Sequence, residues 1–318
     1  MAFDTSPKHG RALVVLFVLA GLAWTQRAEV PDATPPGRVR VTITDRKTGQ
    51  AIAARCYLTD AAGQPWWPDG VIRYEKGAEQ HFVTRGGFEA SLPAGAYTLT
   101  VERGPEYRAA TRQLEVRPGA AGVQNIALER WIDMNARGWY SGDLHNHRDW
   151  REMADLLLAE DLNLAATLTH WIWDDAPRSR PPLEDGGPAV RVVDPAHAYS
   201  VFDTEIERLR NGPGAVNLLA LRAPVGFRGS LLSPANDAFA DQARAQGGYV
   251  DAEKILWRDS AALVALGKVD FAGVVYNHFH RSGVETETEM WGMIPKAKAR
   301  YRTPSACRCG LWTCTTSS

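Results

Sequence analysis

The sequence lacks an excess of charge of either sign. Its 36 Lys and Arg residues almost balance its 37 Asp and Glu residues, which leaves a formal net charge of −1 at pH 7. Proteins that bind nucleic acid usually carry a basic surface that faces the phosphates, so the composition indicates no nucleic-acid partner. Hydrophobic residues make up 45% of the 318 residues, enough to form the cores of two ordinary domains.

Cysteine is also scarce, and motifs for phosphate loops are absent. Four cysteines do not form a disulfide framework, because Cys56 stands alone and the other three crowd into the last dozen residues. That Cys-rich end could bind metal, but residues 304–318 lose all periodicity, and a frameshift or truncated gene explains this anomalous tail better. The sequence has no glycine-rich phosphate loop, dinucleotide fingerprint or Gly-x-Ser-x-Gly motif.

The apolar run near the N-terminus is too short to span a membrane. It covers residues 12–24 and follows Lys8 and Arg11, whereas a spanning helix needs about 20 apolar residues. Residues 1–28 are therefore predicted to be a signal peptide, or alternatively an uncleaved anchor that would be the chain's sole membrane contact. The protein is expected to be extracytoplasmic, either periplasmic or secreted. Residues 29–38 are Pro-rich and are predicted to form a linker.

Residues 39–130 show the pattern of short β-strands. Val39, Val41 and Ile43 alternate with polar residues, as in a strand with one buried face. Further candidate strands lie at 53–58, 87–92, 97–101 and 123–128, separated by turns rich in Gly, Pro and Asp. The pattern predicts an all-β sandwich.

Two segments of this region resemble a known family. The stretch VRVTITDRKTGQAIAARCYLTDAAGQ, followed by FEASLPAGAYTLTVERGPEY, is similar to the carboxypeptidase regulatory-like, transthyretin-like sandwich domains. Such domains commonly precede exported enzymes. The resemblance implies a fold and no chemistry of its own.

From residue 131 onward, candidate strands and helices alternate. Strands are predicted at 139–144, 162–168, 215–221, 249–252 and 271–276, and helices at 152–160, at 203–210 and after Ser233 and Ser260. The alternation predicts parallel strands with helices outside, an α/β barrel-like domain over residues 131–303. Only about five strands precede the tail, so the barrel is expected to be incomplete at its C-terminus.

Several metal-binding residue types fall at the ends of these predicted strands. His145, His147, His170, Glu253 and His278 all do so, and active sites of closed barrels lie at the C-terminal ends of strands. In extended backbone, residues two apart point to one face, so we expect the two histidines of the His-Asn-His segment to project together with Asp143. Two imidazoles and a carboxylate suit Zn²⁺, Mn²⁺ or Fe²⁺, although such pairs also occur on surface strands without metal.

The segment GWYSGDLHNHR resembles the opening metal motif of the polymerase and histidinol phosphatase (PHP) superfamily, and more narrowly of its CehA/McbA group of exported metallohydrolases. The resemblance runs over about residues 131–303. It implies a distorted β/α barrel that binds up to three metal ions and hydrolyses phosphoesters or other esters. By the same match, His145 and His147 are metal ligands.

Later segments depart from the family pattern. LNLAATLTHW keeps His170 but has Thr169 in place of an Asp, so His170 is either a ligand or a hydrogen-bonded histidine at a strand end. GAVNLLALRAP lacks the Glu of the third motif. GGYVDAEKI places Glu253 where a His is usual, and this carboxylate either binds metal or pairs with Lys254 or an arginine. The family's final Asp-x-His is absent.

Two further residues are assigned catalytic roles. Asp143 is expected to orient an imidazole through a hydrogen bond. His278, in YNHFHR, is the candidate acid–base group, although it could instead contact substrate or only flank a loop.

The sequence therefore predicts an exported metal-dependent hydrolase for a small-molecule ester or phosphoester. A carbohydrate is one candidate substrate, because Trp171 and Trp173 follow His170 and could line a sugar pocket, although a packed loop is the alternative. The rival hypothesis is a catalytically degenerate protein of the same fold that binds carbohydrate or another ligand. A third is that an open barrel with exposed strand edges does not fold stably.

Overall fold

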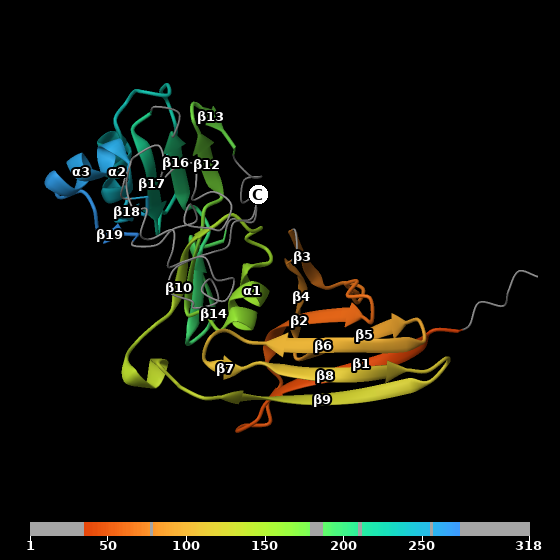
Figure 1. Cartoon of the computed structure of the whole chain (residues 1–318). Helices are drawn as coiled ribbons and strands as arrows, with labels where there is room; N and C mark the ends of the chain where they lie inside the picture. Colours follow the sequence, from red (N-terminus) through yellow and green to blue (C-terminus); the bar gives the residue numbers. More distant parts are fainter. Residues whose placement is uncertain (1–34, 77–78, 179–186, 209–211, 255–256, 274–318) are drawn as a thin grey trace, which may run out of the picture. The chain divides into compact units, whose positions relative to one another are not determined.

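The computed structural model describes residues 35–76, 79–178, 187–208, 212–254 and 257–273 (Figure 1). The predicted signal peptide, most of the linker, the anomalous tail and His278 lie outside these residues. No helix in the described part of the chain is long and apolar enough to cross a membrane.

Nine strands in the first half of the chain form two sheets. The first sheet has the order β5-β1-β9-β7, with β1 (Gly37–Asp45) antiparallel to β5 (Gly87–Leu92) and parallel to β9 (Ala121–Arg130), which pairs with β7 (Tyr107–Arg108). The second sheet is antiparallel throughout and has the order β3 (Ile72–Lys76), β4 (Glu79–Arg85), β2 (Ala53–Asp60), β6 (Gly95–Glu102) and β8 (Ala110–Val116).

The two sheets share one apolar core. Along β1, Val39, Val41 and Ile43 are buried while the residues between them are exposed or half-buried. They join one cluster with Leu58 of β2 and Leu99 of β6. Each strand therefore turns one face inward, which is the side-chain alternation that a two-sheet sandwich needs.

After the short 3₁₀ helix at Asn135–Arg137, the chain enters a four-stranded mixed sheet. Its order is β10 (Gly142–Asn146), β11 (Leu164–Thr167), β15 (His197–Ser200) and β14 (Val190–Asp194). The first three strands are mutually parallel, and β14 is antiparallel to β15. Helix α1 (Met153–Glu160) connects β10 to β11.

A six-stranded mixed sheet completes the described fold. Its order is β13 (Ala176–Pro177), β12 (His170–Trp173), β16 (Thr204–Arg208), β17 (Gly214–Leu219), β18 (Tyr249–Ala252) and β19 (Phe271–Ala272). Helices α2 (Asn236–Ala245) and α3 (Arg258–Ala265) contribute Phe239 and Leu263 to a core with Ile206, Leu218 and Val250. This core lies against one face of the sheet, which leaves the other face of β16 for polar residues.

The predicted α/β barrel is wrong. Across the described residues, three α-helices accompany nineteen strands, and both later sheets are open and mixed, with antiparallel pairs such as β16–β17 and β17–β18. Residues 203–210, which we expected to be helical, include strand β16 instead. All five residues of β16 are buried, and this burial between neighbouring strands overrides the helical preference of Glu and Arg.

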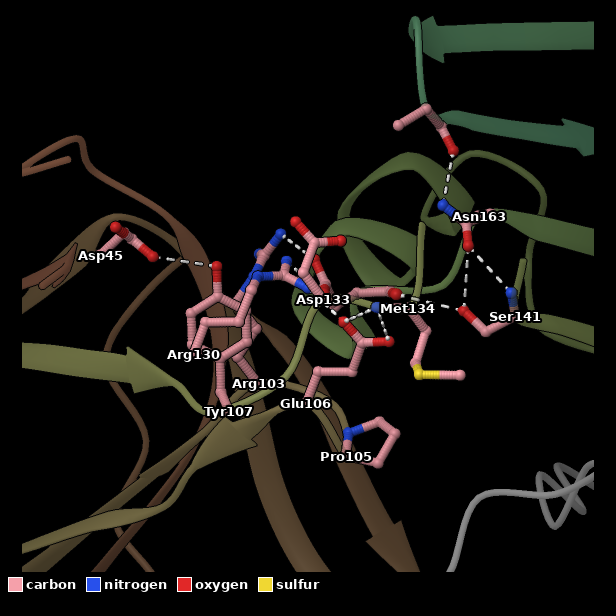
Figure 2. A network of polar contacts seen from close by, with 12 residues as sticks. Asp45, Arg103, Pro105, Glu106, Tyr107, Arg130, Asp133, Met134, Ser141 and Asn163 are labelled. Carbon is pink, nitrogen blue, oxygen red and sulfur yellow. Dashed lines mark hydrogen bonds and ion pairs between the residues drawn. The ribbon is translucent and has the colours of Figure 1, made fainter. Parts of the chain in front are cut away.

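A buried ion-pair network connects the end of α1 to the sandwich (Figure 2). Asp161 caps α1 in the left-handed conformation, with φ 54°. Its two carboxylate oxygens each lie 2.6 Å from a guanidinium nitrogen, one of Arg103 and one of Arg130. Both guanidinium groups also face the ring of Tyr107, at 5.4 and 4.4 Å from its centroid. One carboxylate thus holds two cations of the sandwich, Arg103 directly after β6 and Arg130 at the end of β9.

Replacing Asp161 with asparagine should lower the free energy of unfolding by about 3 kcal/mol. Asparagine tolerates the left-handed conformation, so the change removes charge and little else. The Arg103 side chain, only 8% exposed, would lose its carboxylate, and an unpaired buried charge costs about 3–5 kcal/mol. Urea unfolding followed by tryptophan fluorescence measures the effect.

The matched control is Glu89→Gln. Glu89 pairs with Arg40 at 2.7 Å, but both side chains are about two-thirds exposed, at 65% and 67%. Exposed pairs contribute roughly 0–1 kcal/mol, so this variant should unfold close to the wild-type midpoint. Equal effects of the two substitutions would contradict a structural role for the Asp161 network.

Candidate metal centre

Strand β10 brings two histidines together. His145 lies within the strand and His147 follows its end, and both are buried. Their Nε2 atoms are 3.3 Å apart and their rings are tilted by 74°. The Asp143 carboxylate accepts the backbone N–H of His145 at 2.9 Å, which fixes the backbone at the point where the imidazoles converge.

Glu205 of β16 completes a group of three ligand atoms. Its Oε2 atom lies 2.9 Å from Nε2 of His147 and 3.4 Å from Nε2 of His145. The three side chains are buried, and one ligand atom from each lies within 4.8 Å of the other two. Glu205, 58 positions beyond His147 in the sequence, therefore joins the two histidines in a compact cluster that could hold a metal ion.

The outer nitrogens of the two imidazoles face oxygen atoms. Nδ1 of His147 lies 3.3 Å from the carbonyl oxygen of Leu168, and Nδ1 of His145 lies 2.7 Å from Oε1 of Glu253. The Leu168 carbonyl oxygen favours a hydrogen on Nδ1 of His147, because a carbonyl oxygen accepts hydrogen bonds, and this leaves Nε2 of His147 for the cluster. Glu253 instead forms an ion pair with His145, whose Nε2 also faces the cluster.

Lys254 lies beside the cluster among three carboxylates. Its Nζ atom is 2.7 Å from Glu205, 3.1 Å from Glu207 and 3.4 Å from Glu253, and its side chain is 0% exposed. Burial opposes a charged lysine, but the three carboxylates outweigh it and hold the pKa of Lys254 well above its usual range. Three carboxylates and one ammonium leave an excess of negative charge in a buried place.

This excess acts on His145. Burial disfavours the imidazolium, yet the carboxylates of Glu205 and Glu253 more than offset it and raise the pKa of His145 to about 10. The site therefore attracts positive charge to this imidazole, either as a proton or as a cation. The two compete for the same nitrogen, so metal binding here would release protons.

The three ligand atoms fit the coordination shell of a divalent metal. Tetrahedral sites with bonds of about 2.0–2.1 Å place neighbouring ligand atoms about 3.3 Å apart, and the three separations here are 2.9, 3.3 and 3.4 Å. Two imidazoles and one carboxylate also form the ligand set of catalytic zinc sites that keep a fourth position open. The same donors suit Mn²⁺ and Fe²⁺.

The other predicted site residues lie at varying distances from this group. Asp143 contacts the backbone of His145, and Glu253 contacts both His145 and Lys254. His170 begins β12, half-buried, with Nδ1 3.2 Å from the Thr169 hydroxyl, and burial lowers its pKa. Neither Glu253 nor His170 belongs to the group of three, so their roles as ligands stay predictions, as does that of Asp143 as an orienting group.

Sequence reasoning missed Glu205, Glu207 and the central position of Lys254. The signal was present in Thr204–Arg208, where acidic residues alternate with Ile206 at the two-residue period of a strand. In the predicted helix over residues 203–210, Glu205 and Glu207 would point in different directions. In the observed strand they lie on the same face.

One tryptophan of β12 contacts the cluster, and a second packs against the first. The Trp171 ring lies 4.8 Å from the His147 ring, and its indole N–H donates to Glu207 at 3.2 Å. Trp173 packs against Trp171 at 4.9 Å and is 36% exposed. Trp171 therefore restrains one proposed ligand, and Trp173 offers an aromatic surface next to it.

Comparisons with known proteins place the chain in no family. No family model matches it, and no curated protein matches, so the resemblance to the PHP superfamily stays a prediction. Among solved structures, the chain is similar to the minor pilin GBS52 of Streptococcus agalactiae, at 18% identity and a TM-score of 0.26, over 32% of this chain and 47% of that one.

Two further solved structures are similar over about the same share of this chain. The Bacillus anthracis TIE protein is 15% identical with a TM-score of 0.24, over 30% of this chain and 17% of that one. The major pilin subunit BcpA of Bacillus cereus is 14% identical with a TM-score of 0.22, over 30% of each chain. The chain thus spans less than half the length of each.

Proposed function

We propose that the chain is an exported metal-dependent hydrolase that acts on a phosphoester or another ester. The observation that supports this most directly is the buried convergence of His145, His147 and Glu205 within 4.8 Å. Two imidazoles and a carboxylate are the ligand types of hydrolytic metal sites that keep one position open. Zn²⁺, Mn²⁺ and Fe²⁺ are the ions that we propose.

Each residue of the site has a distinct role in this proposal. His145, His147 and Glu205 hold the ion, which would supply Lewis-acid polarisation of the ester oxygen and lower the pKa of water toward ~7. Leu168 and Glu253 orient the two imidazoles through Nδ1. His278 remains the acid–base group that we propose from the sequence.

The proposed location outside the cytoplasm has separate support. The basic residues and the apolar run before residue 25 form the pattern of an export signal.

Elemental analysis of the full chain tests the proposal. We expect about one Zn, Mn or Fe per chain by plasma mass spectrometry, and loss of this metal in the His145→Ala, His147→Ala double variant. A matched control is His197→Ala, because His197 pairs with Asp194 at 2.7 Å and lies outside the group of three. This control should retain the metal.

The metal-loaded protein is then assayed with p-nitrophenyl phosphate, bis-p-nitrophenyl phosphate and p-nitrophenyl acetate. Hydrolysis that is lost in the double variant and kept in the control supports the proposal. A folded wild-type chain that binds none of the three metals would overturn it, and would favour the catalytically degenerate ligand-binding protein. Bound metal without hydrolysis of any ester class would contradict the activity but not the metal site.

A further inference from the structure

The side chain of Lys254 lies where a second cation would fit. Its ammonium contacts one oxygen from each of three carboxylates, those of Glu205, Glu207 and Glu253, at 2.7–3.4 Å. It is fully buried, and two of its partners lie in β16 while Glu253 directly follows β18. Such a set of carboxylate oxygens is the donor type that Mn²⁺ and Mg²⁺ prefer.

Glu205 connects this ammonium to the group of three. Its Oε2 atom faces the two imidazoles, while its Oε1 atom accepts a hydrogen bond from Lys254 at 2.7 Å. One carboxylate thus serves two positively charged positions, one on each oxygen. Sites with two metal ions 3.5–4 Å apart use carboxylates in the same manner.

The charges agree with this geometry. With neutral imidazoles, the carboxylates of Glu205, Glu207 and Glu253 carry three negative charges against the single positive charge of Lys254. A divalent ion beside the imidazoles would offset the remaining negative charge, to which the buried Asp251 adds because it interacts with Glu253. A second ion would need the carboxylate oxygens that the ammonium already contacts, so the two cannot be held at the same place.

We propose that the ammonium of Lys254 occupies the second cation position and restricts the centre to one divalent ion. Removing the ammonium would open a carboxylate site for Mn²⁺ next to the first ion. This inference deepens the proposed function, on which it rests for the identity of the first position. It assigns Lys254 as the residue that sets the metal stoichiometry.

The test compares the full chain with Lys254→Met, which keeps the length of the side chain and removes its charge. After dialysis against Mn²⁺, the wild type should hold about one ion per chain and the variant about two, because a two-ion site becomes available. Electron paramagnetic resonance of the variant should show the coupled spectrum of a manganese pair. Lys254→Arg, which keeps the charge, should still hold about one ion, since its guanidinium fills the same place.

Adding Glu207→Gln to Lys254→Met should remove the second ion and keep the first. The triple variant His145→Ala, His147→Ala, Lys254→Met should still bind one more ion than the double variant His145→Ala, His147→Ala. A gain in both backgrounds supports the inference even if the wild type binds no metal, so failure of the proposed function is separately visible. No gain in either background overturns the inference.

Loss of the ammonium could unfold the variant, because three buried carboxylates would lose their shared cation. The urea midpoint of Lys254→Met is therefore measured with and without Mn²⁺. We expect the midpoint to fall without the ion and to recover with it, whereas the midpoint of Lys254→Arg should respond to Mn²⁺ as the wild type does. A loss of stability that Mn²⁺ does not reverse would overturn the inference.

Discussion

Replacing Glu205 with glutamine should weaken binding of Zn²⁺ or Mn²⁺ by roughly 100-fold or more, since even outer-shell substitutions cost 10–100-fold in metal affinity. Oε2 of Glu205 is the one carboxylate oxygen in the group of three. The amide keeps the shape of the side chain but provides a neutral, weaker ligand. Isothermal titration with Zn²⁺ measures the affinity, and the rate of ester hydrolysis should fall with it.

Glu207→Gln is the matched control for this substitution. Glu207 lies two residues further along β16 and contacts the same ammonium, at 3.1 Å against 2.7 Å for Glu205. It does not belong to the group of three. Both variants should therefore lose stability, because each removes a charged partner of Lys254, but only Glu205→Gln should lose the metal. Equal metal affinity in the two variants would contradict the proposed ligand set.

Acidification should destabilise the protein through His81. Between pH 7 and pH 4.5, the free energy of unfolding of the wild type should fall by about 2 kcal/mol more than that of His81→Phe. His81 lies in β4, stacks on Tyr74 with ring centroids 4.9 Å apart, and lies 5.4 Å from the ring of Tyr57. Burial, with the nearby cations Arg55 and Arg148, lowers its pKa from 6.5 to about 3.

The direction of this effect follows from the protonation of the two states. Below pH 6.5 His81 is protonated in the unfolded chain, whereas in the folded chain it stays neutral down to about pH 3. The free energy of unfolding therefore falls progressively as the pH drops through this window. Phenylalanine keeps the stacking surface and cannot titrate, so its curve should be flatter.

Urea unfolding at several pH values between 4.5 and 7 measures the two curves. Carboxylates also titrate in this range, but they are common to both proteins and cancel in the difference. Parallel curves for the wild type and His81→Phe would show that another group causes the acid sensitivity.

Those parts of the fold that depend on local patterns could be predicted from the sequence. The strands expected at residues 87–92 and 249–252 coincide with β5 and β18, because alternation and a short run after a glycine pair are local signals. The close approach of His145 and His147 was also predictable, since only two positions separate them. Each of these inferences needed no knowledge of a distant segment.

The composition of the cluster and the arrangement of the sheets depended on distant segments. Glu205 meets Lys254 across 49 positions, and its own segment contains residues that favour helices in isolation. Only the burial of β16 between β12 and β17 shows that it is a strand. The prediction of a barrel was wrong for the same reason. Because β16 was predicted to be a helix, the antiparallel pair β16–β17 looked like a helix followed by a strand.

The alternation along β16 also bears on how the chain selects its strand register. Ile206 enters the apolar core with Phe239, while its neighbours Glu205 and Glu207 face Lys254. A slip of one residue against β12 or β17 would reverse every side chain. Two carboxylates would then be forced into the core, and an isoleucine would sit among charges. The charged cluster therefore disfavours mispaired sheets during folding, independently of any ion that it binds.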